Sequence, residues 1–337
     1  MRAVAYKVPQ PISADTSLID VDLPIPVAKG HDLLVEVKAV SVNPVDVKVR
    51  ASVAPAADEL KVLGWDAAGV VKSVGPEVTK FKAGDEVFYS GVINRPGSNA
   101  EFHLVDAQIV GRKPKTLDFA SAAALPLTSI TAYEALFDRL RVQDPVLGAA
   151  PAILIIGGAG GVGSIAIQIA RALTDLTIIA TASRPETSEW IKQLGAHHVV
   201  DHSQPIAAQV AALGLGAPGF VFSTTNTDQH IKEIVEVIAA QGRFALIDDP
   251  KTLDIVPFKR KAASIHWELM FTRPLFGTPD MIEQHKLLNK VAELVDAGKI
   301  RTTLSETLGP INAANLKKAH AMIESGRTKG KLVLEGF

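Results

Sequence analysis

The stretch AILIIGGAGGVGSIAIQIARAL, residues 152–173, carries the strongest fold signal in the chain. An apolar run at 153–156 leads into a glycine cluster, and a segment with Ile165, Ile169 and Leu173 on one face follows it. Apolar residues at i, i+4 and i+8 are typical of an amphipathic helix. The stretch therefore predicts a strand, a tight turn and a helix.

The turn has glycines at the three G-x-G-x-x-G positions. Such glycines let the turn close, let backbone amides approach a pyrophosphate, and let the helix pack on the strand. The phosphates would lie at the helix N-terminus, where unpaired N–H groups and the helix dipole favour anions. The alternative is a turn that needs glycine for its own sake, but the flanking strand and helix favour dinucleotide binding. The residues expected to contact the cofactor here are Gly158, Gly160, Gly161, Val162 and Gly163. A mononucleotide phosphate loop is excluded, because Ser164 stands where a lysine would be required.

The end of the next strand indicates which dinucleotide binds. Residues 176–182 predict that strand, and an acidic residue about 20 positions after the glycines would bind a ribose 2′-hydroxyl. The chain has Ser183 and Arg184 there instead, and an arginine can pair with a 2′-phosphate. His202, at the neighbouring strand end, is a further candidate for this phosphate. The alternative is a solvated arginine before a helix that starts near Pro185, but the pattern favours NADPH over NADH.

Composition restricts the class of protein. A length of 337 residues suggests two domains, and 47% hydrophobic with 21% charged residues is ordinary for a globular protein. A net charge of −1 gives no reason to expect nucleic acid or an anionic membrane as a partner. The N-terminus has no apolar signal region and no apolar run reaches membrane-spanning length, so we expect a cytoplasmic protein.

The absence of cysteine is the most informative number in the composition. It excludes disulfides, thiol catalysis and cysteine-ligated zinc. The nine histidines form no H-E-x-x-H motif, and there is no G-x-S-x-G motif for a hydrolase.

The pattern changes along the chain. Residues 1 to roughly 110 predict short strands separated by turns, and 122–140 is helix-like. Strands are then expected at 153–156, 177–182, 198–201, 220–223, 243–247 and 265–271, with helices at 161–173, 186–194, 206–212 and 229–240. Helices starting near Thr278 and Asn312 and a last strand at 331–334 complete the chain. We therefore expect an α/β fold with a doubly wound parallel sheet inserted into a β-rich domain, and an active site in the crevice between domains.

The order of these motifs resembles the medium-chain dehydrogenase/reductase superfamily over essentially the full length. The matching stretches are SVNPVDVKVR (41–50), LGWDAAGVVKSVGPEVTKFKAGDEVF (63–88), LPLTSITAYEAL (125–136), IIGGAGGVGSIAIQIARAL (155–173) and GKLVLEG (330–336). The chain is most similar to the quinone oxidoreductase group, and closest to its zinc-type alcohol dehydrogenase-like proteins. The segments NRPGSNAEFHLVDAQIVGRKP and LGPINAANLKKAHAMIESG carry this finer assignment.

The resemblance implies a domain plan and a chemistry. It implies a GroES-like catalytic domain at 1–124 and 268–337, around a Rossmann NADP(H)-binding domain at 125–267. It also implies hydride transfer with a nicotinamide and, commonly, a homodimer. By family position Thr128 and Lys331 lie near the cofactor.

The chain departs from the zinc enzymes of this superfamily at the metal ligands. In those enzymes a cysteine occupies the position of Asn43, a histidine that of Trp65, and a second cysteine lies near Leu127. The four-cysteine structural lobe is also missing, between residues 88 and 101. Asp66 stands in the place of a glutamate and could not hold a metal alone. We therefore expect no zinc.

Without a Lewis acid, an unactivated alcohol or ketone is a difficult substrate. In a conjugated enone or quinone the carbon is already electrophilic, and the developing oxyanion needs only hydrogen-bond donors. Asn43 has two amide donors, and Asp46 could orient the network or relay a proton if its pKa is raised. These two residues are the catalytic candidates, although Asn43-Pro44-x-Asp46 could also be a simple turn.

Other residues are candidates for the substrate pocket. Trp65, Tyr89 and Phe271 could be its aromatic walls, or could belong to the core. For Arg50 two roles stay open: it binds substrate, or it pairs with Asp58 or Glu59.

The sequence thus predicts an NADPH-dependent oxidoreductase that transfers a hydride to a small-molecule quinone or α,β-unsaturated carbonyl. One alternative is a nucleotide-binding redox sensor or structural protein without a catalytic task. A third hypothesis, which the missing ligands disfavour, is a zinc-dependent alcohol dehydrogenase with atypical ligands.

Overall fold

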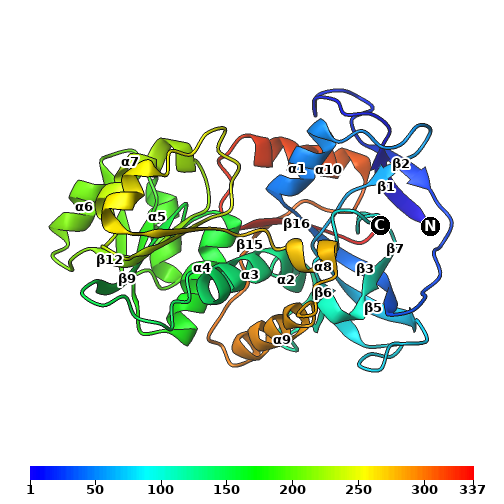
Figure 1. The fold of residues 1–337 in the computed structure, drawn as a ribbon. Helices are drawn as coiled ribbons and strands as arrows, with labels where there is room; N and C mark the ends of the chain where they lie inside the picture. Colours follow the sequence, from blue (N-terminus) through cyan, green and yellow to red (C-terminus); the bar gives the residue numbers. More distant parts are fainter. The chain divides into compact units, whose positions relative to one another are not determined.

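A computed structural model describes residues 1–337 of the protein. The chain divides into two compact units (Figure 1). Unit 1 comprises Met1–Ile130 and Phe271–Phe337, and unit 2 comprises Thr131–Met270. Unit 1 is therefore built from two chain segments that flank unit 2 in the sequence.

Unit 2 contains a six-stranded parallel sheet in the order β11-β10-β9-β12-β13-β14. The strands are β9 (Ala150–Ile156), β10 (Thr177–Thr181), β11 (His198–Val200), β12 (Pro218–Ser223), β13 (Arg243–Leu246) and β14 (Ser264–Trp267). The order runs outward in both directions from β9, as in a doubly wound sheet that binds dinucleotides. The predicted fold class is confirmed.

Helices connect these strands, each close to its predicted position. They are α4 (Gly161–Leu173), α5 (Pro185–Gln193), α6 (Ile206–Ala212) and α7 (Thr227–Val237), and the short 3₁₀ helix η3 (Val256–Lys261) precedes β14. Ile165 and Ile169 of α4 are fully buried, which explains the apolar stripe in the sequence. Phe244, Ile234 and Leu154 belong to a core cluster that joins the sheet to α7.

The prediction of a single helix over 122–140 is wrong. The structure has α2 (Phe119–Ala123), then α3 (Pro126–Tyr133), which continues into a π-helix, η2 (Glu134–Arg139). Pro126 has no N–H to donate and disfavours helical backbone in the residue before it, so the first helix stops there. The strand expected to reach residue 271 ends at Trp267, and α8 (Thr272–Phe276) follows.

Unit 1 is β-rich. A seven-stranded sheet has the order β15-β16-β3-β5-β6-β8, with β7 also paired to β3, and a three-stranded sheet has the order β2-β1-β4. The strands are β1 (Arg2–Tyr6), β2 (Ile19–Asp22), β3 (Asp32–Val42), β4 (Lys61–Val62), β5 (Ala67–Val74), β6 (Glu86–Tyr89), β7 (Phe102–Asp106), β8 (Val110–Arg112), β15 (Leu304–Thr307) and β16 (Lys331–Glu335). The helices are α1 (Pro44–Ser52), η1 (Ala107–Ile109), α9 (Glu283–Asp296) and α10 (Ala313–Glu324).

One strand pair in unit 1 decides where the candidate site forms. β16 lies antiparallel to β3, with Leu332 opposite Val42. This register brings Lys331, near the C-terminus, to the end of β3 where the chain enters α1.

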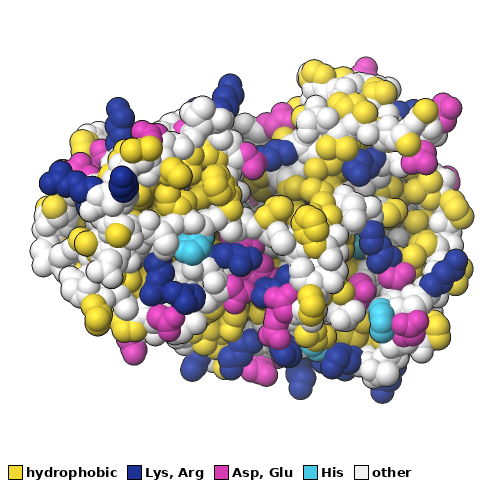
Figure 2. Space-filling model, viewed as in Figure 1, with side chains coloured by type: hydrophobic (Ala, Val, Ile, Leu, Met, Phe, Trp, Pro, Cys, Tyr) yellow, Lys and Arg dark blue, Asp and Glu magenta, His cyan; other side chains and the backbone are white.

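The surface is mixed. On the face drawn in Figure 2, acidic and basic side chains lie side by side with apolar side chains between them. β14 forms one edge of the unit 2 sheet, and Trp267 on it is 56% exposed. The homodimer implied by the resemblance stays a prediction. None of the helices is long and apolar enough to cross a bilayer.

A buried carboxyl group in unit 2 makes stability depend on pH. The side chain of Glu268 is fully buried, and its Oε2 accepts a hydrogen bond from Arg139 Nε at 2.7 Å. Burial, and then the neighbouring carboxyl group of Glu134, raise the pKa of Glu268 well above its usual value near 4.5, although Arg139 lowers it. Glu268 therefore carries a proton in the folded protein at neutral pH.

We expect the Glu268→Gln variant to be more stable than the wild type at alkaline pH, and to match it near pH 4.5. Because the folded pKa is raised, the wild type takes up a proton on folding and loses stability as the pH rises toward that pKa. Glutamine presents an acceptor to Arg139 without needing a proton, so the gain should reach about 1–3 kcal/mol. Urea unfolding as a function of pH measures it. The matched control Glu189→Gln, exposed on α5, should show no such trend, and a pH-independent difference for Glu268→Gln would contradict the prediction.

Candidate active site

The N-terminus of α1 positions the two catalytic candidates. Asn43 caps the helix with extended backbone, and Pro44 follows at the first helical position, where its fixed φ suits a helix. Asp46 reaches back so that its Oδ2 accepts a hydrogen bond from Asn43 N at 2.8 Å, and its Oδ1 accepts one from Gly64 N at 3.0 Å. Asp46 therefore links the backbone of Asn43 to the backbone of Gly64, which follows β4.

Asp46 is 1% exposed, and both carboxylate oxygens are engaged by backbone N–H groups. Burial raises the pKa of Asp46 to about 7, against the lowering effects of Asn43 N, Lys331 and Gly64 N. In this arrangement the carboxyl group orients the turn around Asn43 and changes its protonation state near neutral pH.

Asp66, Asn43 and Lys331 form a second set of buried contacts. Asp66 Oδ2 accepts a hydrogen bond from Asn43 Nδ2 at 3.1 Å and lies 3.2 Å from Lys331 Nζ. Asp66 Oδ1 accepts one from Leu127 N at 3.0 Å. Lys331 Nζ also donates to Asn43 Oδ1 and, at 3.0 Å, to Val42 O. We name Asn43, Asp46, Asp66 and Lys331 the buried polar cluster.

Burial opposes charge on both members of the ion pair. It raises the pKa of Asp66 and lowers the pKa of Lys331, while the attraction between the two groups acts in the opposite direction on each. Asp66 is 0% and Lys331 3% exposed, so the pair is shielded from water and its hydrogen bonds are strong.

The cluster fixes the orientation of the Asn43 amide. Its carbonyl oxygen faces the Lys331 ammonium group, and its Nδ2 donates to Asp66 Oδ2 and, at 3.3 Å, to Ser41 O. The two amide donors that the sequence analysis assigned to a substrate oxygen are thus directed at protein acceptors. Sequence reasoning missed the role of Asp66 and its pairing with Lys331. The signal available was an aspartate next to Trp65, in the segment that carries the family resemblance.

The aromatic candidates separate into two contacts. Trp65 and Phe271 meet edge to face with ring centroids 6.2 Å apart, and Trp65 Nε1 donates to Val92 O at 3.1 Å. Tyr89 instead stacks on His103, with its hydroxyl 3.1 Å from His103 Nδ1. Trp65, Tyr89 and Phe271 are all at most 2% exposed. The structure therefore brings Trp65 and Phe271 together, and it places Tyr89 against His103.

Arg50 does not pair with Asp58 or Glu59, which was one of the two roles that the sequence left open. Its guanidinium group is 1% exposed, and it donates to Glu324 Oε1, Gln10 O and, at 3.3 Å, His320 Nδ1. Arg50 thereby ties α1 to α10 and to the N-terminal loop. The pairing with Asp58 or Glu59 is wrong, because the side chain points into the unit.

The glycine turn of unit 2 follows β9. Gly157, which the sequence analysis left out, has a φ of +79°, and a Cβ there would lie 2.4 Å from Thr224 Oγ1. The adjacent pair Gly157–Gly158 was the available signal. A Cβ on Gly163 would lie 2.3 Å from Gly157 O, so this glycine lets α4 pack on the turn.

Gly160 differs from these glycines. A Cβ on it would come no closer than 3.5 Å to its nearest contact, Gly157 O, so the protein itself has room for a side chain. Gly160 caps α4, whose next N–H groups, from Gly161 to Gly163, have no carbonyl one turn earlier to bind. An open cradle lined by unpaired amides fits the pyrophosphate of a dinucleotide, and these residues would hold it.

The residues expected at the ribose lie at neighbouring strand ends. Ser183 and Arg184 follow β10, Ser183 is exposed, and Arg184 Nε lies 3.1 Å from Glu186 Oε1. His202 follows β11 and its Nδ1 lies 3.1 Å from Thr181 Oγ1. Thr128, in unit 1, is 2% exposed and its hydroxyl donates to Leu125 O at 3.2 Å.

The residues at the zinc-ligand positions do not fit a zinc ion. Asn43 is a neutral amide whose oxygen binds the Lys331 ammonium group, and Trp65 Nε1 is only a donor. Asp66 is the one anionic side chain there, and it already accepts bonds from Lys331, Asn43 and Leu127. Zinc requires three or four N, S or O ligands around it, and no group of three or more acidic or histidine side chains is arranged for a metal.

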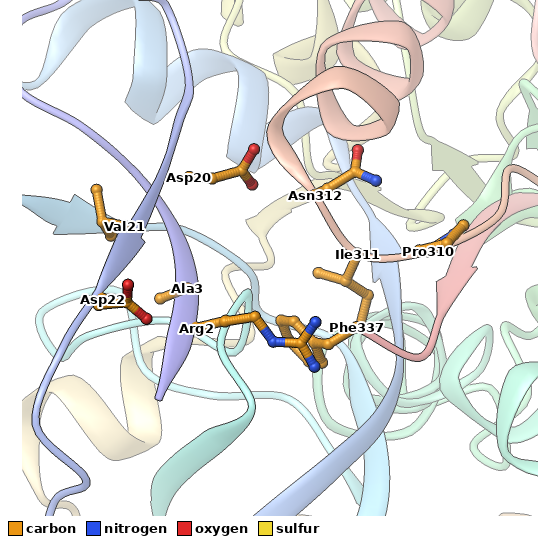
Figure 3. Close-up of a pocket in the computed structure, with 9 residues that line it drawn as sticks. All are labelled: Arg2, Ala3, Asp20, Val21, Asp22, Pro310, Ile311, Asn312 and Phe337. Atoms are coloured by element: carbon orange, nitrogen blue, oxygen red, sulfur yellow. The ribbon is translucent and has the colours of Figure 1, made fainter.

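Unit 1 also contains a cavity of about 450 Å³ near the chain termini. Figure 3 shows Asp20 and Asp22 of β2, Asn312 at the start of α10, and Arg2 beside the ring of Phe337. None of its lining residues belongs to the predicted site or to the buried polar cluster.

Comparisons with known proteins agree with this architecture. Residues 29–115 match the alcohol dehydrogenase GroES-like domain family, and residues 194–334 match the zinc-binding dehydrogenase family. A zinc-type alcohol dehydrogenase-like protein of Staphylococcus aureus (strain MSSA476) is 39% identical over 311 residues, which cover 92% of this chain and 92% of that protein.

Two further relatives extend the comparison. A crystal structure of a Rhizobium etli CFN 42 protein, provisionally named a zinc-dependent alcohol dehydrogenase, is 71% identical with a TM-score of 0.99, and the match covers 100% of this chain and 98% of the other. The 2-methylene-furan-3-one reductase of Solanum lycopersicum is 29% identical over 330 residues, which cover 96% of this chain and 76% of that protein.

The first family match lies in unit 1, and the second begins in unit 2 and ends in the second segment of unit 1. The Staphylococcus aureus relative is similar over nearly the whole of both chains. The chain is therefore an oxidoreductase of the medium-chain dehydrogenase/reductase superfamily.

Proposed function

We propose that this oxidoreductase is zinc-independent and uses NADPH to reduce a quinone or an α,β-unsaturated carbonyl compound. The observation that carries the proposal is the Lys331 ammonium group bound to Asn43 and Asp66, where zinc enzymes of the superfamily have metal ligands. A site without a Lewis acid suits an acceptor whose carbon is already electrophilic. The tomato relative is named as a reductase of a methylene furanone, which is an acceptor of this kind.

A bound reduced nicotinamide would supply the hydride. The protein's own contribution is to hold the acceptor and stabilise the negative charge that develops on its oxygen. Asn43 Nδ2 is the proposed donor, because its 3.3 Å bond to Ser41 O is its longer contact and the one that a substrate oxygen would replace. The 3.1 Å bond to Asp66 Oδ2 would hold the amide in place meanwhile.

We expect the protein to oxidise NADPH in the presence of a quinone or an enone, and Asn43→Ala to lower kcat by about 10²-fold. That loss corresponds to the removal of one donor to a developing oxyanion. The measurement is NADPH absorbance with a panel of both acceptor classes, together with the Kd for NADPH. The matched control is Asn94→Ala, an exposed asparagine in a turn of the same unit.

Two results would overturn this function. No turnover with any acceptor, in protein that binds NADPH, would favour a nucleotide-binding sensor or structural protein. Stoichiometric zinc in protein purified without a histidine tag, at a site required for activity, would favour the zinc-dependent alternative.

We expect Arg184→Ala to weaken NADPH binding by about 1.5–3 kcal/mol, which is the value of a hydrogen bond to a charged group. NADH binding should hardly change, because NADH has no 2′-phosphate for the guanidinium group to bind. Fluorescence titration of both nucleotides measures the two effects. In this structure Arg184 pairs with Glu186, so binding NADPH would replace an exposed ion pair of low value. Equal affinity of the wild type for the two nucleotides would contradict the assignment.

A further inference from the structure

A short hydrogen-bond chain links the glycine turn to a histidine in unit 2. Thr181, at the end of β10, is 1% exposed, and its Oγ1 accepts a hydrogen bond from Gly157 N at 3.0 Å. The same hydroxyl lies 3.1 Å from His202 Nδ1. The imidazole of His202 is therefore held by the residue that also holds the first glycine of the turn.

This contact occupies one ring nitrogen of His202. Either the Thr181 hydroxyl donates to His202 Nδ1 or a protonated Nδ1 donates to the hydroxyl, according to the tautomer of the imidazole. Nε2 has no hydrogen-bond partner within the protein, so it is available to a ligand.

A second histidine lies next to the first. The ring centroids of His202 and His230, on α7, are 6.1 Å apart, an interval that one phosphate group could bridge through two N–H···O bonds of about 2.8 Å. The imidazole of His230 makes no hydrogen bond within the protein. Burial lowers the pKa of the His202 imidazole, Asp201 opposes this shift, and the positive charge of Arg184 lowers the pKa further.

The acidic groups near the two histidines are mostly engaged elsewhere. Asp248 accepts from Thr227 N and Oγ1, and Glu233 Oε2 accepts from Ala207 N. Asp201, beside His202, accepts from Ser203 N and Oγ. Asp228, on the first turn of α7, accepts from Gln229 N at 3.0 Å. These carboxylates favour protonation of the histidines, but the larger effect of burial lowers the pKa of both. Both imidazoles are therefore mainly neutral at pH 7 without a ligand.

We propose that His202 and His230 form a proton-dependent part of the 2′-phosphate site beside Arg184, so that binding of NADPH takes up a proton from solvent and binding of NADH does not. The inference rests on the proposed use of NADPH, and it adds His230 as a specificity-determining residue. The proton would go to the imidazole of His202 or of His230, and the resulting cation would donate an N–H to the phosphate. The phosphate dianion would then stabilise the cation that burial disfavours.

The linkage has a definite sign. Because the nucleotide-bound state holds more protons, affinity for a 2′-phosphate should rise as the pH falls, by at most about tenfold per pH unit for one proton. Below about pH 6 the phosphate itself gains a proton, so the trend should level off there. Ligands without a 2′-phosphate should show neither trend.

The experiment uses the full chain and two matched probes, adenosine 2′,5′-bisphosphate and adenosine 5′-monophosphate. Calorimetry in buffers of different ionisation heat gives the number of protons taken up by each, in the wild type, His230→Gln, His202→Gln and the double variant. His266→Gln, a histidine on β14 that contacts Ser264, is the matched control. NADH affinity reports whether each variant keeps its fold. If the His202 variants lose NADH affinity, the proton uptake of His230→Gln alone tests the proposal.

The expected result is proton uptake with the bisphosphate alone, reduced in His230→Gln and abolished in the double variant, with His266→Gln like the wild type. A preference for the bisphosphate with the same uptake in His230→Gln as in the wild type would overturn the inference and leave NADPH use intact. No preference for the bisphosphate at any pH would overturn both.

Discussion

Replacing Lys331 with methionine should lower the free energy of unfolding by about 3–5 kcal/mol, the cost of breaking a buried ion pair on one side. Lys331 Nζ binds Asp66 Oδ2 at 3.2 Å, Val42 O at 3.0 Å and Asn43 Oδ1. Without it, the Asp66 carboxylate stays buried with only Asn43 and Leu127 as donors. Two acceptor oxygens also lose their partner, which adds to the cost.

The pH dependence of this variant follows from the same contacts. Burial already raises the pKa of Asp66, and Lys331 opposes that shift. Removing Lys331 should raise the pKa further, so the variant should lose stability as the pH rises above the usual range of an aspartate. Guanidinium unfolding at several pH values measures the effect.

A second substitution separates the charge from the packing. Asp66→Asn in the Lys331→Met background removes the unpaired carboxylate and should recover much of the stability, as a double-mutant cycle would show. We expect NADPH turnover to stay low in both variants, because the Asn43 amide has lost its fixed orientation. A loss below about 1 kcal/mol in Lys331→Met would mean that the pair is solvated like a surface ion pair.

The second large effect is expected at the glycine turn, where two glycines should respond differently. Gly163→Ala places a Cβ 2.3 Å from Gly157 O, so the turn or α4 must move. We expect a loss of about 1–3 kcal/mol of stability, as in an overpacked core, together with loss of nucleotide binding.

Gly160→Val is the matched comparison. Its Cβ has room within the protein, so stability should change little. The side chain would stand where the pyrophosphate approaches the amides, and the loss of one charge-assisted bond would weaken nucleotide binding roughly ten- to hundredfold. Thermal unfolding and NADPH titration of both variants measure the two effects. If Gly160→Val bound NADPH like the wild type, this turn would not hold the phosphates.

The elements of unit 2 were predictable because their signals are local. The bounds expected for α4 and α6 agree with the observed Gly161–Leu173 and Ile206–Ala212. In both cases the spacing of apolar residues along the helix decides which face is buried. Turn glycines are similarly local, since backbone geometry within a few residues demands them.

Helix α1 shows where local signals fail. Val45, Val47 and Val49 alternate along it, which is a strand-like pattern, yet the segment forms a helix from Pro44 to Ser52. The helix starts because Asn43, Pro44 and Asp46 cap it, and the buried Arg50 contacts hold its last turn. The sequence therefore identified Asn43 and Asp46 as candidates, but it did not predict helix α1, which positions them.

The sequence by itself determined the fold class, the family resemblance and the glycine turn, because periodicity and glycine geometry act between near neighbours. Only the tertiary structure decided what Asn43, Asp66 and Lys331 do. Lys331 and Asn43 are separated by 288 positions, and they meet because β16 pairs with β3 in one register. Such a contact depends on the register of the sheet. The sequence shows that the chain contains an amide, a carboxylate and an ammonium group, but only the folded structure determines which of these groups bind each other.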